Sequence, residues 1–364
     1  MSVIPILRPK LPTADRLAPY LAEIDRSRLY SNFGPHAQVL EERIAAHFGL
    51  PGGTVTTVAN ATLGLTLALT AQGPSASTLC VLPAWTFVAS AHAVVLAGLT
   101  PYFVDVDPFT WALDPLAVEH EIREAPARVG AVMVVAPFGR PIDYRKWDEF
   151  KIRTGLPVVI DSAAAFDSLK VGLCPAVVSL HATKVIGVGE GGFVASRDTA
   201  LIRGVRERSN FGFHGGRHAE MAATNAKLSE YHAAVGLAAL DMWDEIRADW
   251  MAAAGHYRRA LAESNSLNLQ PGFGETWISS TCVVSIAARV HTRVQAELST
   301  AGIDTRMWWG SGVHREQAAA HYPRGQLPAT ENLANSTLGL PLYRDIPERD
   351  VQHIAKTLIA ATTW

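Results

Sequence analysis

Asp161 places a carboxyl group directly after a short apolar segment. Residues Val158–Ile160 are all apolar, and small side chains follow at Ser162–Ala165. In an open α/β sheet, ligands bind beside the carboxyl ends of the strands, so this carboxylate lies where a ligand could reach it. An aspartate here is also typical of a helix N-cap, and its position alone favours that structural role.

Lys184 adds a candidate nucleophile in a stretch of apolar and glycine residues, Val177–Gly192. Burial lowers the pKa of a lysine and makes its neutral amine available for covalent chemistry. A single lysine is far more often a solvated surface residue. The whole stretch together with Asp161, rather than the lysine alone, predicts a catalytic site.

Three glycines in the same stretch match the G-x-G-x-x-G pattern of dinucleotide sites: Gly187, Gly189 and Gly192. A dinucleotide-dependent oxidoreductase is therefore one alternative. That site needs a helix N-terminus to hold the pyrophosphate, whereas Phe193–Ser196 has the composition of a strand. The strand composition after the glycines therefore disfavours a dinucleotide site.

Charge and composition exclude several classes of protein. The 364 residues carry 32 Lys and Arg against 34 Asp and Glu, a net charge of −2, which gives no basic footprint for nucleic acid. Three isolated cysteines form neither a disulfide framework nor a metal motif, so we expect no metal and a cytoplasmic protein. No apolar run reaches the roughly 18 residues of a membrane span, so we expect no membrane partner.

The elements that would position these residues alternate along the chain from about residue 36. β-branched runs alternate with Ala- and Leu-rich stretches, which predicts an α/β fold with a mostly parallel central sheet. We expect strands at 54–58, 78–82, 101–104, 131–135, 158–160 and 193–196, and helices at 39–48, 63–71, 88–97, 147–154 and 225–240. A change of pattern predicts a large domain at residues 1–243 and a smaller α+β domain at 244–364, with a strand at 282–286 and helices at 294–301 and 351–359.

The order and spacing of several segments resemble the pyridoxal-phosphate-dependent nucleotide-sugar aminotransferases of the DegT/DnrJ/EryC1/StrS group. The resemblance covers nearly the whole chain and implies the aspartate aminotransferase fold (type I) and a homodimer with shared active sites. The segments are Gly34-Pro35, Leu40-Glu41, Asn60-Ala61-Thr62, Pro83–Phe87, Phe103–Asp107, Ile160–Ala164, Ser179–Lys184, Gly189–Gly192, Asn225–Glu230, Ala233-Ala234 and Leu340-Pro341.

The resemblance also implies roles for individual residues. Lys184 is similar to the lysine that holds pyridoxal 5′-phosphate covalently and moves the proton during transamination. Asp161 is similar to the partner of the pyridine nitrogen, whose charge keeps that nitrogen protonated. Phe87 resembles the aromatic that covers the ring, with Trp85 as an alternative.

The phosphate would be held by a second group of residues. Thr62 and the amides around Ala61, where the family usually has glycine, match a helix-N-terminal phosphate site, and Ser179 matches a phosphate-binding serine. Asn225 matches an asparagine that reaches the phosphate from the neighbouring subunit. Another departure is Ala164, where the family commonly has His or Gln.

The implied reaction transfers an amino group from L-glutamate to a nucleotide-linked keto-deoxysugar, for amino sugar biosynthesis in a surface polysaccharide (O-antigen, lipopolysaccharide) or an antibiotic. Arg306 and His314 are candidates for binding the substrate. Amination at C3 or C4, glutamine as donor and an inositol-type acceptor stay open.

Two further alternatives use the same fold. A deoxysugar dehydratase, which is a lyase, also uses this cofactor, but its relatives replace the lysine with histidine, so Lys184 favours transamination. A non-catalytic relative that binds cofactor or sugar is disfavoured because Lys184 and Asp161 are both present.

Overall fold

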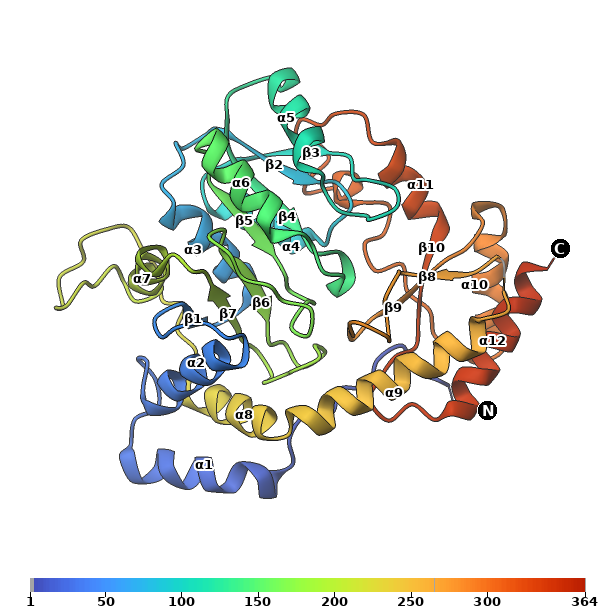
Figure 1. The fold of residues 1–364 in the computed structure, drawn as a ribbon, viewed down its shortest axis with the longest axis horizontal. Helices are drawn as coiled ribbons and strands as arrows, with labels where there is room; N and C mark the ends of the chain where they lie inside the picture. Colours follow the sequence, from blue (N-terminus) through green and yellow to red (C-terminus); the bar gives the residue numbers. More distant parts are fainter. Residues whose placement is uncertain (1–2, 265, 364) are drawn as a thin grey trace.

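A seven-stranded sheet forms the centre of the computed structural model, which describes residues 3–264 and 266–363 (Figure 1). Its strands are β1 (Val55–Val58), β2 (Leu79–Pro83), β3 (Thr100–Val104), β4 (Val129–Val135), β5 (Val158–Asp161), β6 (Ala176–Ser179) and β7 (Gly192–Ala195). They lie in the order β1-β7-β6-β5-β4-β2-β3. Only β7 runs antiparallel to its neighbours in this sheet, and the other pairs are parallel. The predicted fold class is therefore confirmed.

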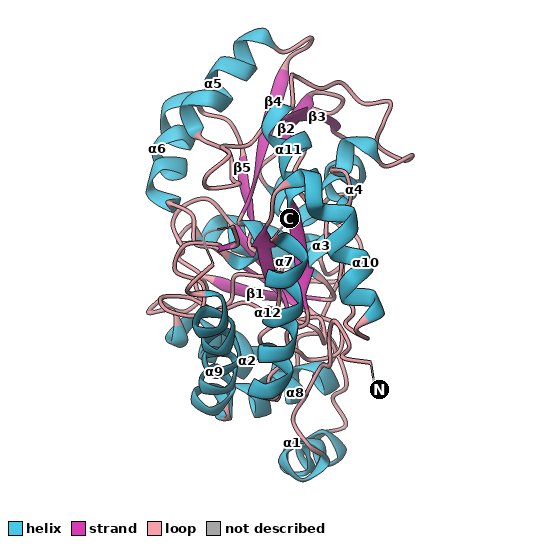
Figure 2. Ribbon diagram, turned by 90° about the vertical axis from the view of Figure 1, so that its right-hand side faces the viewer, coloured by secondary structure: helices cyan, strands magenta, loops and turns pink. Residues whose placement is uncertain are grey.

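Helices cover both faces of this sheet. The helices of this part of the chain are α1 (Ala14–Ser27), α2 (Pro35–His47), α3 (Ala61–Ala71), α4 (Val88–Leu96), α5 (Pro115–Glu124), α6 (Tyr144–Thr154), α7 (Thr199–Arg208), α8 (Glu230–Asp241) and α9 (Trp243–Leu261), of which α1 packs on α8 rather than on the sheet. Figure 2 shows α5 and α6 on one side of β4 and β5, and α3 and α4 on the other.

Alternate residues of each strand enter two different apolar clusters. Val159 packs with the residues of α3 and α4, whereas Val158 and Ile160 pack on the opposite face with Trp147 and Phe150 of α6. A strand buried on both faces needs apolar residues at every position, because neither side meets water. This burial explains why the predicted strands are continuous apolar runs.

The C-terminal part contains a second, three-stranded antiparallel sheet. The elements of the C-terminal part are β8 (Asn268–Leu269), β9 (Cys282–Ser285), α10 (His291–Thr300), α11 (Pro328–Ser336), β10 (Thr337–Leu340) and α12 (Glu348–Thr362). The strands of this sheet lie in the order β10-β9-β8. The proposed domain boundary after residue 243 falls at the start of α9. The N-terminal segment joins this part, since Ile4 pairs with Ile303 and the amide of Leu342 donates to the carbonyl of Ile6.

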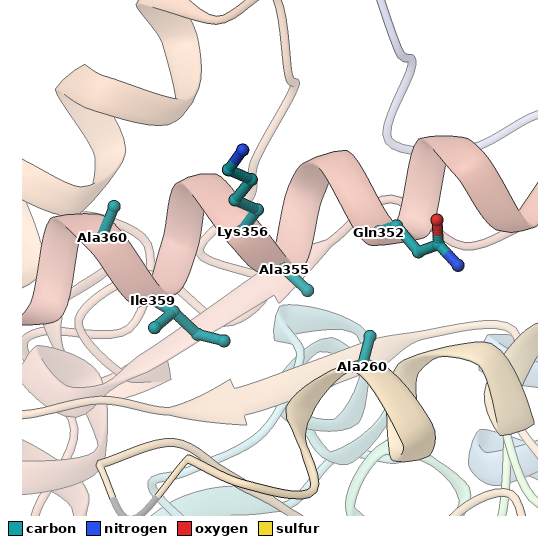
Figure 3. Close-up of a pocket in the computed structure, with 6 residues that line it drawn as sticks. All are labelled: Ala260, Gln352, Ala355, Lys356, Ile359 and Ala360. Carbon is teal, nitrogen blue, oxygen red and sulfur yellow. The ribbon is translucent and has the colours of Figure 1, made fainter.

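A shallow groove of about 450 Å³ lies between α9 and α12 (Figure 3). Its lining is mostly apolar and comes from Ala260 on α9 and from Gln352, Ala355, Lys356, Ile359 and Ala360 on α12. None of the candidate site residues lines it, so it is separate from the chemistry considered below.

One predicted helix begins later than the sequence pattern indicates. The pattern predicts a helix over 225–240, whereas α8 begins at Glu230, with the Ser229 hydroxyl accepting from the His232 amide. Residues 225–229 are non-helical because they pair elsewhere: the Ala226 carbonyl accepts from the Ala59 amide at 2.7 Å. The tertiary pairing thus overrides the local helical pattern.

Buried Glu230 ties α8 to the start of α2. Its carboxylate accepts the amides of His36 and Ala37 at 2.7 and 3.0 Å, two groups that have no partner within α2. This explains in structural terms why Gly34-Pro35 and Glu230 belong to the same pattern.

Within the described residues, no helix is both long and apolar enough to span a bilayer. The same residues contain no group of three or more His, Cys, Asp or Glu side chains arranged to hold a metal ion.

Candidate active site

The candidate site residues meet at the carboxyl edge of the central sheet. Asp161 ends β5, Ser179 ends the adjacent β6, and Gly192, paired with Ser179, begins β7. Gly192 also pairs with Val58 at the end of β1, after which Asn60 begins α3. Segments far apart in the sequence are therefore brought to the edge where α/β sheets bind ligands.

Asp161 is a buried strand residue and not a helix cap. Its Oδ2 accepts from the Ser90 hydroxyl at 2.7 Å, and its Oδ1 accepts from the Ala163 amide at 3.1 Å. Burial raises the pKa of Asp161, while these two hydrogen bonds and the charge of Lys184 act in the opposite direction. The carboxylate is thus held in a fixed orientation in a poorly solvated place.

Lys184 lies in a loop whose shape is determined by backbone hydrogen bonds. Its amide donates to the His181 carbonyl at 2.9 Å, and the Ala182 amide donates to the Gly189 carbonyl at 2.8 Å. Gly187 closes the loop so tightly that a Cβ there would lie 2.8 Å from the Ala182 carbonyl oxygen.

The Lys184 side chain is half-buried, and none of the described residues hydrogen-bonds its amine. Burial lowers the pKa of Lys184, and the Asp161 charge partly opposes that effect. A lysine with a lowered pKa and no bonded partner is suited to covalent and proton-transfer chemistry.

The N-terminus of α3 forms an anion-binding corner. Asn60 caps the helix by accepting the Leu63 amide at 2.9 Å, and the amides of Ala61 and Thr62 belong to the first turn, where N–H groups have no partner within the helix. Gly192 lets β7 approach closely, since a Cβ there would lie 3.0 Å from the Ala61 nitrogen. Ser179 pairs with Gly192, which brings its backbone beside this corner, and its hydroxyl accepts from the His181 amide at 3.2 Å.

Phe87 and Trp85 have different surroundings. Phe87 is the N-cap of α4 and is 56% exposed, whereas Trp85 is 2% exposed and packs against Phe138 and Trp309. Only the Phe87 ring is open to a ligand, so exposure favours Phe87 over Trp85 as the residue that covers a bound ring.

Comparison with known proteins identifies the family. A model described as the DegT/DnrJ/EryC1/StrS aminotransferase family matches residues 13–359. The chain belongs to this family. Protein Rv3402c of Mycobacterium tuberculosis (strain H37Rv) is 28% identical over 368 residues, covering 96% of this chain and 88% of that protein.

Two other relatives of this DegT/DnrJ/EryC1/StrS protein have informative names. The dTDP-4-amino-4,6-dideoxy-D-glucose transaminase of Shigella dysenteriae is 30% identical over 271 residues, covering 72% of each chain. DesI, whose crystal structure was determined in the presence of its TDP-sugar product, is 31% identical in sequence to this chain. The two structures match with a TM-score of 0.89, covering 100% of this chain and 94% of that chain.

The cofactor of this DegT/DnrJ/EryC1/StrS protein is pyridoxal phosphate, and the residues at the carboxyl edge fit it. Its aldehyde needs an amine, which Lys184 offers without a competing partner. Its ring nitrogen needs a carboxylate, which Asp161 offers, and its phosphate needs amides and hydroxyls, which the corner of α3 and Ser179 offer. An amine, a carboxylate and an anion-binding corner at one sheet edge therefore match the aldehyde, the ring nitrogen and the phosphate of the cofactor.

Asn225 lies on the connection between α7 and α8. Its backbone pairs with that of Asn210, and its side chain is exposed. It is therefore free to contact another molecule. The loop that carries it is attached to the main sheet region through Ala226 and Ala59.

The two candidates for substrate binding differ in accessibility. Arg306 is exposed, with its guanidinium carbon 5.2 Å from the centroid of the Trp308 ring. His314 is buried, and both of its ring nitrogens lack a hydrogen-bond partner among the described residues. Burial lowers the pKa of His314. The structure leaves Arg306 open to a ligand and encloses His314.

The sequence reasoning missed two hydroxyl residues beside Asp161. Ser90 donates to Asp161, and Thr86 lies 2.8 Å from Ser90, oxygen to oxygen. The available signal was a pair of hydroxyl residues at the start of α4: Thr86 precedes the N-cap Phe87, and Ser90 lies in the first turn. That signal has no meaning until β5 is known to lie beside α4.

Proposed function

We propose that this protein is a pyridoxal-phosphate-dependent aminotransferase that transfers an amino group from L-glutamate to a nucleotide-linked keto-deoxysugar. The observation that carries the proposal is the pair formed by an unbonded, half-buried Lys184 and a buried Asp161 at one sheet edge. The named activity of the Shigella transaminase and the TDP-sugar product named with the DesI structure support a nucleotide sugar as the acceptor. Bound pyridoxal phosphate supplies an electrophilic carbonyl carbon and an electron-accepting ring.

Lys184 has two roles in this proposal. Its amine binds the cofactor covalently between turnovers, because the lowered pKa favours the neutral, nucleophilic form. With substrate bound, the same amine would be placed to take the proton from the donor Cα and, with the acceptor bound, to give a proton to the acceptor carbon that receives the amino group. A general base must be neutral to accept a proton, so burial serves both roles.

Asp161 holds positive charge at the ring nitrogen. Its ionised carboxylate accepts a hydrogen bond there, which stabilises the protonated nitrogen and so favours the withdrawal of electrons from the donor Cα. Phe87 covers one face of the ring and excludes water from it. The amides of Ala61 and Thr62 and the Ser179 hydroxyl bind the phosphate.

Two copies of the chain complete the sites in this proposal. Asn225 reaches the phosphate in the partner's site, for which its exposure is suitable. Exposed Leu29, Tyr30 and Tyr231 give an apolar surface beside the start of α8, where the centroids of the two stacked tyrosine rings lie 6.2 Å apart. Apolar surface of this kind is typical of protein interfaces.

Arg306 is proposed to bind an anionic group of the substrates, either the diphosphate of the nucleotide sugar or the carboxylate of the donor. An exposed guanidinium is suited to both, because its planar donors match two oxygens at once. His314 is proposed only as a support of this loop, because it is enclosed. The surface-polysaccharide or antibiotic pathway and the cytoplasmic location stay predictions.

The visible absorbance of the purified protein tests the function. With added pyridoxal phosphate, we expect a band at roughly 400–430 nm from the lysine-bound cofactor, which disappears when glutamate is added and 2-oxoglutarate is released. Lys184→Ala is the matched control and should show neither change. A band that persists with glutamate and glutamine in the wild type would contradict transamination and favour the lyase or non-catalytic alternative.

A further inference from the structure

A chain of buried hydroxyl groups leads from the start of α4 to the Asp161 carboxylate. Thr86 Oγ1 lies 2.8 Å from Ser90 Oγ, which lies 2.7 Å from Asp161 Oδ2. Thr86, Ser90 and Asp161 are all buried. Thr86 and Ser90 have no role in the function proposed above.

The chemistry of the three groups determines the direction of the hydrogen bonds. An ionised carboxylate can only accept, so Ser90 must donate its single proton to Asp161. Ser90 then has no proton for Thr86, which therefore donates to Ser90. Hydrogen bonds in such a chain polarise one another, so Thr86 strengthens the donor that reaches Asp161.

The first turn of α4 adds a second influence. Ser90 is the third residue of this helix, so the Asp161 carboxylate lies beside the N-terminal end of α4. The helix dipole stabilises negative charge at that end. In the segment Thr86–Ser90, the Phe87 side chain is exposed to solvent and the two hydroxyl side chains are buried. One short segment therefore carries both the residue proposed to cover the cofactor ring and the groups that bind the carboxylate.

We propose that Ser90, oriented by Thr86, is a positioning residue that holds the Asp161 carboxylate as an ionised acceptor aimed at the ring nitrogen. The part of this proposal that concerns the ring nitrogen rests on the proposed function. The orientation and ionisation of Asp161 are properties of this chain alone and can be measured without the cofactor.

The decisive experiment follows the titration of Asp161 in the cofactor-free full-length protein. Aspartate labelled with ¹³C at Cγ gives carboxyl signals by NMR, and the Asp161 signal is assigned by its loss in Asp161→Asn. In Ser90→Ala the ionised form loses a donor, so we expect the midpoint to rise by about one pH unit or more, a tenfold change in proton affinity. Among the described residues, Lys184 is the charged group that acts on Asp161, and it is unchanged in this comparison.

Three further variants make the result specific. Thr86→Val keeps the Ser90 donor and should raise the midpoint by less than Ser90→Ala. Ser90→Cys keeps the size of the side chain with a weaker donor, and it serves if Ser90→Ala does not fold. Ser196→Ala removes another buried hydroxyl, which donates to the Leu173 carbonyl at 2.8 Å, and should leave the Asp161 signal unchanged.

Steady-state kinetics of the loaded enzyme give an independent measurement. Ser90→Ala should lower kcat about tenfold. The KM for glutamate should stay within about twofold, because in this proposal glutamate does not contact the buried Ser90 side chain. An Asp161 midpoint that is the same in wild type, Ser90→Ala and Ser90→Cys overturns the inference. Failure of glutamate to change the cofactor band in the wild type overturns the proposed function instead, so the two failures are distinguishable.

Discussion

The charges of Lys184 and Asp161 shift each other's pKa in the direction opposite to the shift that burial causes. The Asp161 charge raises the pKa of Lys184 and the Lys184 charge lowers the pKa of Asp161, yet burial is the larger effect on both. The pKa of Lys184 is therefore lowered, and that of Asp161 is raised. Both shifts favour the neutral forms. The Lys184 amine is thereby prepared for reaction, whereas the Asp161 carboxylate is stabilised as an ion by a cation beside it, such as a protonated ring nitrogen.

Replacing Asp161 by asparagine should stabilise the cofactor-free protein at neutral pH. Because the folded-state pKa is raised, protonated Asp161 stabilises the fold below the unfolded pKa, and this contribution is lost as pH rises through the folded pKa. We expect Asp161→Asn to raise Tm by about 2–4 °C at pH 8 and by less at pH 4. Calorimetry across this range is the measurement, and a Tm difference independent of pH would contradict the argument.

The same substitution should make Lys184 easier to deprotonate. Among the described residues, the Asp161 charge is the influence that raises the pKa of Lys184, and the substitution removes it. In cofactor-free Asp161→Asn, reductive methylation of Lys184 followed by mass spectrometry should reach its half-maximal rate at a lower pH than in the wild type. An unchanged half-maximal pH would indicate that the two side chains do not interact, and a shift to higher pH would contradict the direction argued here.

Lys184→Arg should abolish transamination without unfolding the protein. Arginine keeps the positive charge but cannot give a neutral amine, so we expect kcat to fall by at least about a thousandfold. The measurement is 2-oxoglutarate release from glutamate, with circular dichroism as the check of folding. In Lys184→Ala, added methylamine should restore part of the proton-transfer rate, whereas Lys184→Arg should not respond.

Gly192→Ala should weaken cofactor binding through the anion-binding corner. A Cβ at Gly192 would lie 2.8 Å from the Val178 carbonyl oxygen and 3.0 Å from the Ala61 nitrogen, so β7 and α3 must separate. Overpacking of this size costs about 1–3 kcal/mol, so we expect the Kd for pyridoxal phosphate to rise about tenfold. Gly52→Ala is the control, because nothing lies within 4 Å of a Cβ there.

Mixed dimers test the proposal that Asn225 acts in the partner's site. Lys184→Ala and Asn225→Ala should each be impaired alone. If the sites are shared, a hybrid of the two variants has one site with both substitutions and one site with neither, so mixing should restore up to about half of the wild-type activity per hybrid dimer. Light scattering gives the oligomeric state. No recovery in a confirmed hybrid would place Asn225 in its own subunit's site.

Local sequence patterns predicted much of the sheet and both central residues of the site. Continuous apolar runs such as Val158–Ile160 mark strands buried on both faces, and the surroundings of Lys184 and Asp161 are visible along the chain. The glycine pattern before β7 was correctly predicted to lead into a strand, since Gly192–Ala195 is extended. The strand inferences succeeded because each depends on neighbours a few residues away.

Other features depend on contacts between distant segments. The exposed Asn225 loop follows from pairing with Ala59, although its residues have a helical pattern. The choice of Phe87 over Trp85 follows from the packing of Trp85 against Trp309.

The amino-acid sequence alone thus determined six of the seven strands of the central sheet, the family pattern and the chemical identity of Lys184 and Asp161. The tertiary structure alone decided which groups control them: it placed Ser90 beside Asp161, 71 residues apart in the chain, and Gly192 against Ala61. The physical reason is that secondary structure follows from local periodicity, whereas burial and hydrogen-bond partners exist only once distant strands and helices have packed.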